Sequence, residues 1–194
     1  MFNPFIGVAS WFAFFVAIEH LGEIELAATN VIRSISTLFF VIVNSLAATT
    51  GSLVSNLLGA RQKHLVIPLC NRIIRLGYAI GFPLIVLCII FSNYIFYIYS
   101  GNGNLIQMAR LPFIVALLNY AFALPGYVYM NAVTGTGATR ITFIFQTVTI
   151  VAYQIYLWSI SYFSTSLSVY WTAEYLYVIL LGLLAVIYLK NKNY

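Results

Sequence analysis

The sequence has no aspartate and few charged residues of any kind. Charged residues make up 7% of the 194-residue chain, whereas hydrophobic residues make up 62%. Soluble domains carry about 25% charged residues, and a soluble fold of this size cannot hide so much apolar surface from water. The composition therefore excludes a water-soluble protein and predicts an all-α integral membrane protein.

The chain also lacks the residue patterns of common catalytic and metal sites. Its two cysteines and two histidines form no cluster with metal-ligand spacing. Cys70 lies in a basic connection and Cys88 lies inside an apolar stretch, where both thiols are expected to act as apolar filler. The sequence contains no Gly-rich phosphate loop, nucleophile elbow or acidic motif for prenyl diphosphates. We therefore expect no enzyme activity, no bound metal and no cofactor.

Six apolar stretches follow one another along the chain. They predict membrane-spanning helices at about residues 4–21, 30–58, 73–91, 105–134, 141–163 and 169–189. The last five are long enough for the roughly 20 residues that a bilayer crossing requires, whereas the apolar part of the first is shorter. Because no soluble domain or linker interrupts them, residues 1–194 are expected to form a single six-helix transmembrane lobe.

The positions of the charged residues predict the orientation of this lobe. If the chain crosses six times, seven of the nine basic residues lie on one side: Arg61, Lys63, Arg72, Arg75, Arg140, Lys190 and Lys192. The other side carries Glu19, Glu23, Glu25, the uncharged residues 100–104 and a weakly charged connection ending at Glu174. Lys and Arg mark the cytoplasmic side, so both termini are expected in the cytoplasm of a bacterium, with the protein in its inner membrane. Topology thus explains the net charge of +5, and no basic stripe with interleaved aromatics indicates nucleic-acid binding.

Polar residues recur at helical spacing within three of the expected spans. They are Ser45, Thr49, Ser52 and Asn56 on the second, Tyr120, Tyr127, Asn131 and Thr134 on the fourth, and Thr142, Gln146, Thr149, Tyr153 and Tyr156 on the fifth. Such faces either line a polar cavity or let helices pack closely and hydrogen-bond across the contact. Gln146 and Tyr153 are too bulky for close packing, which favours a cavity on the fifth helix. Both interpretations remain open for the second helix.

Two charged residues lie close to or within apolar stretches. Glu19 ends the first stretch, where it marks the interface or, if desolvated, carries a proton. Arg110 lies about one and a half turns inside the fourth stretch; snorkelling to the outer interface is favoured over a role with substrate. Pro83, Pro112 and Pro125 fall inside spans and predict kinks, which are either static or points of bending.

Four short motifs are distinctive: Glu19-His20-Leu21-Gly22-Glu23, Leu26 to Ser34, Leu53 to Ala60 and Asn131 to Arg140. These motifs resemble those of MATE-family multidrug exporters. The first motif is similar to the family branch found in Bacteroidetes-like bacteria. The resemblance implies the C-terminal six-helix lobe of a twelve-helix transporter, with a central cavity between the two lobes. It also implies an antiporter that exports cationic or amphipathic small molecules in exchange for H⁺ or Na⁺.

The resemblance also implies roles for particular residues. The candidate substrate-cavity residues are Tyr120, Tyr127, Asn131, Gln146, Thr149, Tyr153, Ser45, Thr49 and Asn56. Some members of the family place acidic residues on the first and fourth helices of this lobe, near Gly7 and Ala123 of this chain, neither of which can bind a cation. The resemblance therefore favours a coupling carboxylate in the other lobe, and Glu19 is the candidate for ion coupling on this chain. The expected partners are an N-terminal six-helix lobe or a second copy, small-molecule drugs and the lipid bilayer.

Two other functions are compatible with the sequence. A lipid-linked oligosaccharide flippase of the same superfamily would have comparable helices but a more basic cavity, for which Arg110 is the only indication. A membrane assembly subunit without transport of its own would also fit, because a single lobe encloses no complete pathway.

Overall fold

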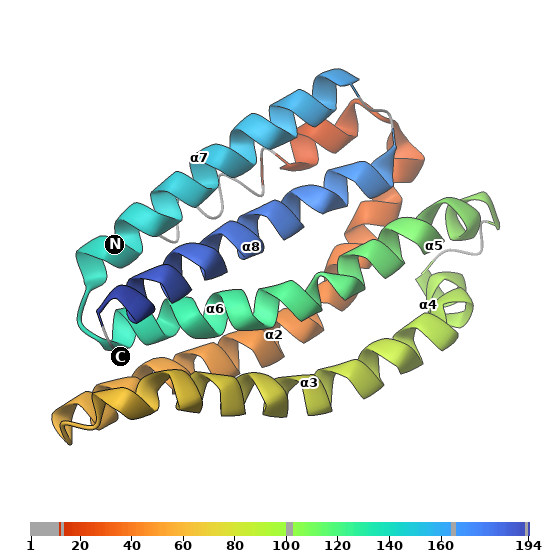
Figure 1. The fold of residues 1–194 in the computed structure, drawn as a ribbon. Coiled ribbons are helices and arrows are strands. Elements are labelled where there is room, and N and C mark those ends of the chain that lie inside the picture. Colours follow the sequence, from red (N-terminus) through yellow and green to blue (C-terminus); the bar gives the residue numbers. More distant parts are fainter. Residues whose placement is uncertain (1–11, 13, 100–102, 164–165, 193) are drawn as a thin grey trace.

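The computed structural model describes residues 12, 14–99, 103–163, 166–192 and 194, and every regular element among them is helical (Figure 1). These elements are α2 (Glu23–Gly59), the 3-10 turn η1 (Lys63–Leu65), α3 (Val66–Ile90), α4 (Ser92–Tyr99), α5 (Gly103–Leu118), α6 (Tyr120–Gly135), α7 (Thr139–Phe163) and α8 (Leu167–Asn191). Residues 14–19 are helical as well. The predicted all-α fold is confirmed.

Five stretches among the described residues are long and apolar enough to cross a membrane. They are Glu23–Gly59, Lys63–Ile90, Ile106–Gly135, Thr139–Phe163 and Leu167–Asn191. Each overlaps one of the last five expected spans, whereas half of the expected span at 4–21 lies outside the described residues. With 37 residues, α2 is about 55 Å long, so it must tilt within or extend beyond a hydrocarbon core of about 30 Å.

The connection between α2 and α3 is shorter than the sequence suggested. Helix α3 begins at Val66, seven residues before the expected span at about 73–91. Pro68 lies in the first turn of the helix, where its missing N–H removes no helical hydrogen bond. Val66 and Cys70 are fully buried, and their burial stabilises this turn against the rest of the lobe.

The expected fourth span consists of two helices, α5 and α6, that meet at Asn119. The N–H of Asn119 donates to the carbonyl oxygen of Val115 over a long 3.2 Å. The hydroxyl of Tyr175 on α8 donates to the same carbonyl at 2.6 Å. A neighbouring helix therefore supports the backbone on one side of the break, as the absence of water inside a bilayer requires.

Pro125 affects the backbone on the other side of this break. Proline has no N–H, so the carbonyl of Ala121, four residues earlier, lacks its usual helical donor. The hydroxyl of Tyr78 on α3 donates to this carbonyl at 2.5 Å. Pro83 and Pro112 also lie within helices, namely α3 and α5.

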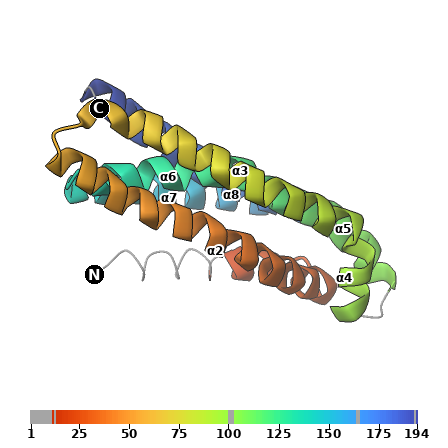
Figure 2. The ribbon, with the colours of Figure 1, turned by 90° about the horizontal axis from the view of Figure 1, so that it is seen from below.

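Helix α6 lies at the centre of the lobe, in contact with α2, α3 and α8 (Figures 1 and 2). Glycines allow each of these contacts. A Cβ atom on Gly126 would lie 2.6 Å from a backbone oxygen of α8, and one on Gly135 would overlap the backbone oxygen of Gly51 on α2. Gly81 of α3 leaves room for the ring of Tyr120. These small residues let α6 approach three neighbours closely, which is typical of helix packing in membranes.

The α2–α3 connection, the α6–α7 connection and the end of α8 gather at one end of the lobe (Figures 1 and 2). The ammonium nitrogen of Lys63 lies 5.9 Å from the centre of the Tyr194 ring, which joins two of these segments. Arg61, Arg140 and Lys190 belong to the same end. Most of the basic residues are thus at one end of the lobe, and the assignment of this end to the cytoplasm stays a prediction.

Candidate functional site

A cavity of about 270 Å³ lies between α2, the α5–α6 segment and α8. Helix α2 contributes Arg33, Ser36 and Phe40 to its wall, and α8 contributes Trp171 and Glu174. These residues follow one another at steps of three or four, so each helix presents a single face to the cavity. The wall is therefore built from regular helices and needs no loop.

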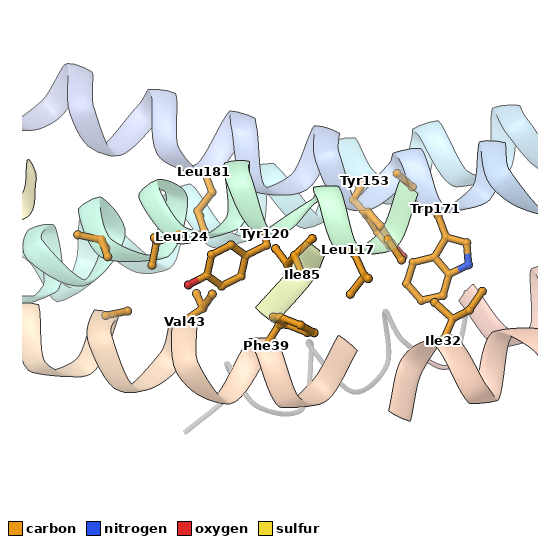
Figure 3. Close-up of a cluster of buried hydrophobic side chains, with 14 of the residues drawn as sticks. Ile32, Phe39, Val43, Ile85, Leu117, Tyr120, Leu124, Tyr153, Trp171 and Leu181 are labelled. Carbon is orange, nitrogen blue, oxygen red and sulfur yellow. The ribbon is translucent and has the colours of Figure 1, made fainter. Parts of the chain in front are cut away.

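Aromatic side chains form much of this wall. The rings of Phe39 and Tyr120 meet edge to face with their centres 6.0 Å apart, and those of Phe40 and Tyr127 do so at 5.5 Å. Trp171 is only 3% exposed and lies beside Ile32 of α2 (Figure 3). Such edge-to-face contacts fix the ring orientations and leave flat apolar surfaces for a ligand.

Glu174 is the only acidic residue among the described residues that line this wall. The hydroxyl of Tyr153 on α7 donates a hydrogen bond to its Oε1 atom at 3.2 Å. The prediction that Glu174 ends a connection is wrong, because α8 begins at Leu167 and carries Glu174 two turns inside the helix. A carboxylate inside a membrane span is costly and therefore indicates a functional site. No group of three His, Cys, Asp or Glu among the described residues could hold a metal ion.

Three buried polar atoms on the cavity wall have no hydrogen-bond partner within the described part of the chain. They are the Ser36 hydroxyl oxygen, the Asn119 amide oxygen and the Trp171 indole nitrogen. Buried polar atoms are almost always hydrogen-bonded, and each exception needs an explanation. The three include a donor, an acceptor and a hydroxyl that can do both, so they are suited to a polar ligand.

Three of the predicted cavity residues lie at or near this site. Tyr120 and Tyr127 are part of its wall. Tyr153 is buried and reaches the site through Glu174. Asn131 is not among the lining residues; its amide nitrogen donates to the Tyr127 carbonyl at 3.0 Å.

The other predicted residues on α7 lie away from the cavity wall. Thr149 is fully buried, and its hydroxyl donates to the carbonyl of Phe145 at 2.7 Å. Gln146 is half-buried and does not line the cavity. A role of either residue in substrate contact stays a prediction.

The polar stripe on α2 lies on the outside of the lobe. Ser45, Thr49 and Asn56 are exposed, and the two hydroxyls donate to carbonyls of their own helix at 2.8 Å. Close packing on α6 instead uses an adjacent face of α2, which includes the buried Thr50 and Gly51. The stripe is thus a polar surface that contacts no other described helix closely, and its part in a substrate cavity stays a prediction.

Glu19 and Arg110, the two charged residues considered in the sequence analysis, do not line the cavity. Glu19 is exposed at the end of the helical residues 14–19 and does not line the cavity. Arg110 is exposed in a shallow hollow beside Tyr94 and Tyr97, between α4 and α5. This position is compatible with snorkelling, which stays a prediction.

The wall residues that sequence reasoning missed include Arg33, Ser36, Asn119, Trp171 and Glu174. The sequence does contain a signal for Arg33 and Glu174. Each is a charged residue inside an apolar stretch, with polar or aromatic residues three or four positions away. No sequence signal marked Asn119, whose position depends on the break between α5 and α6.

The comparison with known proteins agrees with this architecture. No curated protein and no solved structure matches the chain. The family model MatE matches residues 2–159, which is well over half of the chain and ends within α7. Proteins of this family are transporters, generally of the multidrug or flippase type, and not enzymes. The chain, with its long apolar helices and the cavity between them, therefore belongs to the MatE family of membrane transporters.

Proposed function

We propose that this chain forms one lobe of a cation-coupled antiporter that exports amphipathic small molecules, and that Glu174 binds the coupling H⁺ or Na⁺. The observation that carries this proposal is a lone carboxyl group on the wall of an aromatic cavity, 3.2 Å from the Tyr153 hydroxyl. A single carboxylate can hold either the coupling cation or a positively charged substrate, but not both. Competition for this charge would couple the two movements, because each ligand favours a different state.

The surroundings of Glu174 suit such an exchange. When the carboxylate is charged, it attracts the cationic group of a substrate, and the rings of Phe40 and Tyr127 offer cation–π contacts of about 0.5 to 2 kcal/mol. Binding of H⁺ or Na⁺ neutralises the carboxylate and releases the substrate. The close contacts of α6 with three helices favour movement of the lobe as one body that rocks against a partner.

The exposed polar face of α2 supports the presence of such a partner. Ser45, Thr49, Ser52 and Asn56 would face lipid tails if the lobe were alone in the bilayer, and polar groups are unfavourable there. We propose that this face meets a second six-helix lobe, which is either an N-terminal lobe or a second copy of this chain. In this arrangement the basic end of the lobe lies in the cytoplasm of a bacterium, in accordance with the positive-inside rule.

Efflux of ethidium from drug-sensitive bacterial cells tests this function. The cells would express the chain alone or together with an N-terminal six-helix lobe. We expect Glu174→Gln to abolish the efflux, because the amide carries no charge, and the exposed Glu23→Gln to retain it as a matched control. Equal efflux by wild type and Glu174→Gln would contradict the coupling role. Efflux no higher than that of cells with an empty vector, in both settings, would favour the assembly subunit instead.

A flippase for lipid-linked oligosaccharides is the second candidate, favoured by one observation. Arg33 lies on the cavity wall, where it could contact a lipid phosphate. Glu174 on the same wall opposes this, because a pyrophosphate would be repelled by the carboxylate. The pair of opposite charges therefore supports the exporter more than the flippase.

A further inference from the structure

A second hollow, of about 720 Å³, lies between α4 and α5. These helices are at the end of the lobe opposite to the α2–α3 and α6–α7 connections (Figures 1 and 2). The third lining residue on each helix follows the other two by three and four positions, so each helix presents one face to the hollow. The lining residues are Asn93, Tyr94 and Tyr97 of α4 and Ile106, Gln107 and Arg110 of α5.

Aromatic packing holds the two walls of this hollow together. The rings of Phe96 on α4 and Phe113 on α5 meet edge to face with their centres 5.3 Å apart. Both side chains are fully buried, and so is Ala109 beside Arg110. The hollow is therefore shaped by two packed helices, and its polar side chains project from a fixed surface.

The charge in this hollow is positive and lacks a counter-ion. Arg110 is the only charged residue among those that line it, and residues 92–118 contain no Asp or Glu. Arg110 is exposed and takes part in none of the hydrogen bonds or ion pairs within the described part of the chain. The guanidinium and the amide groups of Asn93 and Gln107 can all donate hydrogen bonds. This set of groups is suited to an anion.

The position of the hollow indicates that this anion belongs to a lipid. Arg110 lies four residues, or about 6 Å along the axis, inside the candidate span that begins at Ile106, so its long side chain can reach back to the headgroups. Tyr94 and Tyr97 are 71% and 69% exposed, as is typical of tyrosines at the boundary between membrane and water. Leu111, one turn deeper than Gln107, continues this face as exposed apolar surface. A ligand with an anionic head and a hydrocarbon tail fits both parts.

We propose that the hollow between α4 and α5 binds an anionic phospholipid, with its phosphate at Arg110 and its acyl chain along Leu111. A phosphate can accept two parallel hydrogen bonds from the guanidinium and offsets the cost of a charge near the apolar layer. A zwitterionic lipid also brings an ammonium group, for which no lining residue offers a negative charge. The hollow shares no lining residue with the cavity that contains Glu174, so this inference does not depend on the proposed function.

Photolabelling of the purified full chain in non-ionic detergent tests this inference. The probe is phosphatidylglycerol that carries a diazirine in its acyl chain close to the glycerol, and mass spectrometry identifies the labelled peptides. We expect saturable labelling within residues 93–111. Unlabelled phosphatidylglycerol should compete at about five- to tenfold lower concentration than phosphatidylcholine with the same acyl chains. Glycerol 3-phosphate, which has the phosphate but no tail, should compete poorly.

Variants of exposed arginines at the two ends of the lobe provide the matched comparison. Arg110→Gln should raise the probe concentration for half-maximal labelling of residues 93–111 about tenfold, because the charged donor is lost. Arg72→Gln on α3 removes the same charge at the basic end and should leave this labelling unchanged. Arg110→Lys keeps the charge without the two parallel donors and should lie between wild type and Arg110→Gln. It also serves as the comparison if Arg110→Gln does not fold.

Four results would overturn the inference. Equal competition by the two phospholipids would show that the hollow does not select a negative headgroup. Equal labelling of wild type and Arg110→Gln would show that Arg110 does not bind the phosphate. Competition by glycerol 3-phosphate as strong as that by phosphatidylglycerol would identify a soluble phosphate as the ligand. Absence of label from residues 93–111 in the wild-type chain would show that no lipid occupies the hollow.

Discussion

Removal of the Tyr78 hydroxyl should destabilise the lobe through the proline that lies in α6. In Tyr78→Phe, the carbonyl of Ala121 loses the donor that replaces the missing N–H of Pro125. Hydrogen bonds between membrane helices contribute about 0.6 kcal/mol on average and about 1.7 kcal/mol at most. A bond of 2.5 Å to a carbonyl without its helical donor belongs in the upper part of this range, so we expect a loss of about 1 to 1.5 kcal/mol.

Pro125→Ala provides the second arm of a double-mutant cycle. Alanine restores a backbone N–H at residue 125, which can donate to the carbonyl of Ala121 four residues earlier. In this background Tyr78→Phe should cost close to nothing, so the coupling between the two positions should be about 1 kcal/mol. Thermal unfolding in detergent would report it, since about 1 kcal/mol shifts the midpoint of a chain of this size by roughly 2 to 4 °C.

Tyr175→Phe is the matched control for this cycle. Its hydroxyl also donates to a carbonyl beside the break, that of Val115, but this carbonyl keeps the N–H of Asn119 as a second donor. The free energy of unfolding lost in Tyr175→Phe should therefore be smaller than that lost in Tyr78→Phe. It should also be the same with proline or alanine at residue 125. An equal cost of Tyr78→Phe in both backgrounds would show that the Tyr78 hydroxyl does not replace the missing N–H of Pro125.

Two further substitutions test the packing of α6 and the exposed face of α2. Gly126→Ala places a Cβ atom 2.6 Å from the carbonyl oxygen of Val178 and should lower the free energy of unfolding by about 1 to 3 kcal/mol. Its control, Gly59→Ala, has no atom within 4 Å of the new Cβ and should raise this free energy by up to about 1 kcal/mol. Equal shifts of the two unfolding midpoints would contradict the close contact. Ser45→Cys should react with a membrane-impermeant maleimide in cells if it faces a water-filled space between lobes. The control Ile98→Cys, at another exposed but apolar position, should react more slowly if it faces lipid. Equal rates would argue against a polar space beside α2.

The number and order of the long helices follow from the sequence because apolar length is a local property. The bilayer requires about 20 apolar residues per crossing, and the stretches that end at Gly59, Phe163 and Leu189 satisfy this requirement on their own. The start of α3 was less predictable. Pro68 is a turn signal when read alone, and only the burial of Val66 shows that it belongs to the first helical turn.

The site was less predictable than the fold because it depends on which helices become neighbours. Tyr120 and Tyr127 were found by their spacing, and both line the cavity. Ser45 and Thr49 have the same spacing, yet their face is turned away from the described helices. Periodicity identifies a polar face but does not say what lies opposite. Sequence reasoning assigns Glu174 to the end of an outer connection, although this residue lies inside the apolar stretch at 169–189.

Helix α8 completes the site, and this gives the order of synthesis a functional meaning. Of the described helices it is the last to leave the ribosome, and it brings both Trp171 and Glu174 to the cavity. Before it inserts, α2 and α6 can already associate through Gly51 and Gly135, but the resulting cleft has neither its carboxylate nor its tryptophan wall. If the proposed function is right, a nascent chain therefore gains its binding site only when α8 is in the membrane.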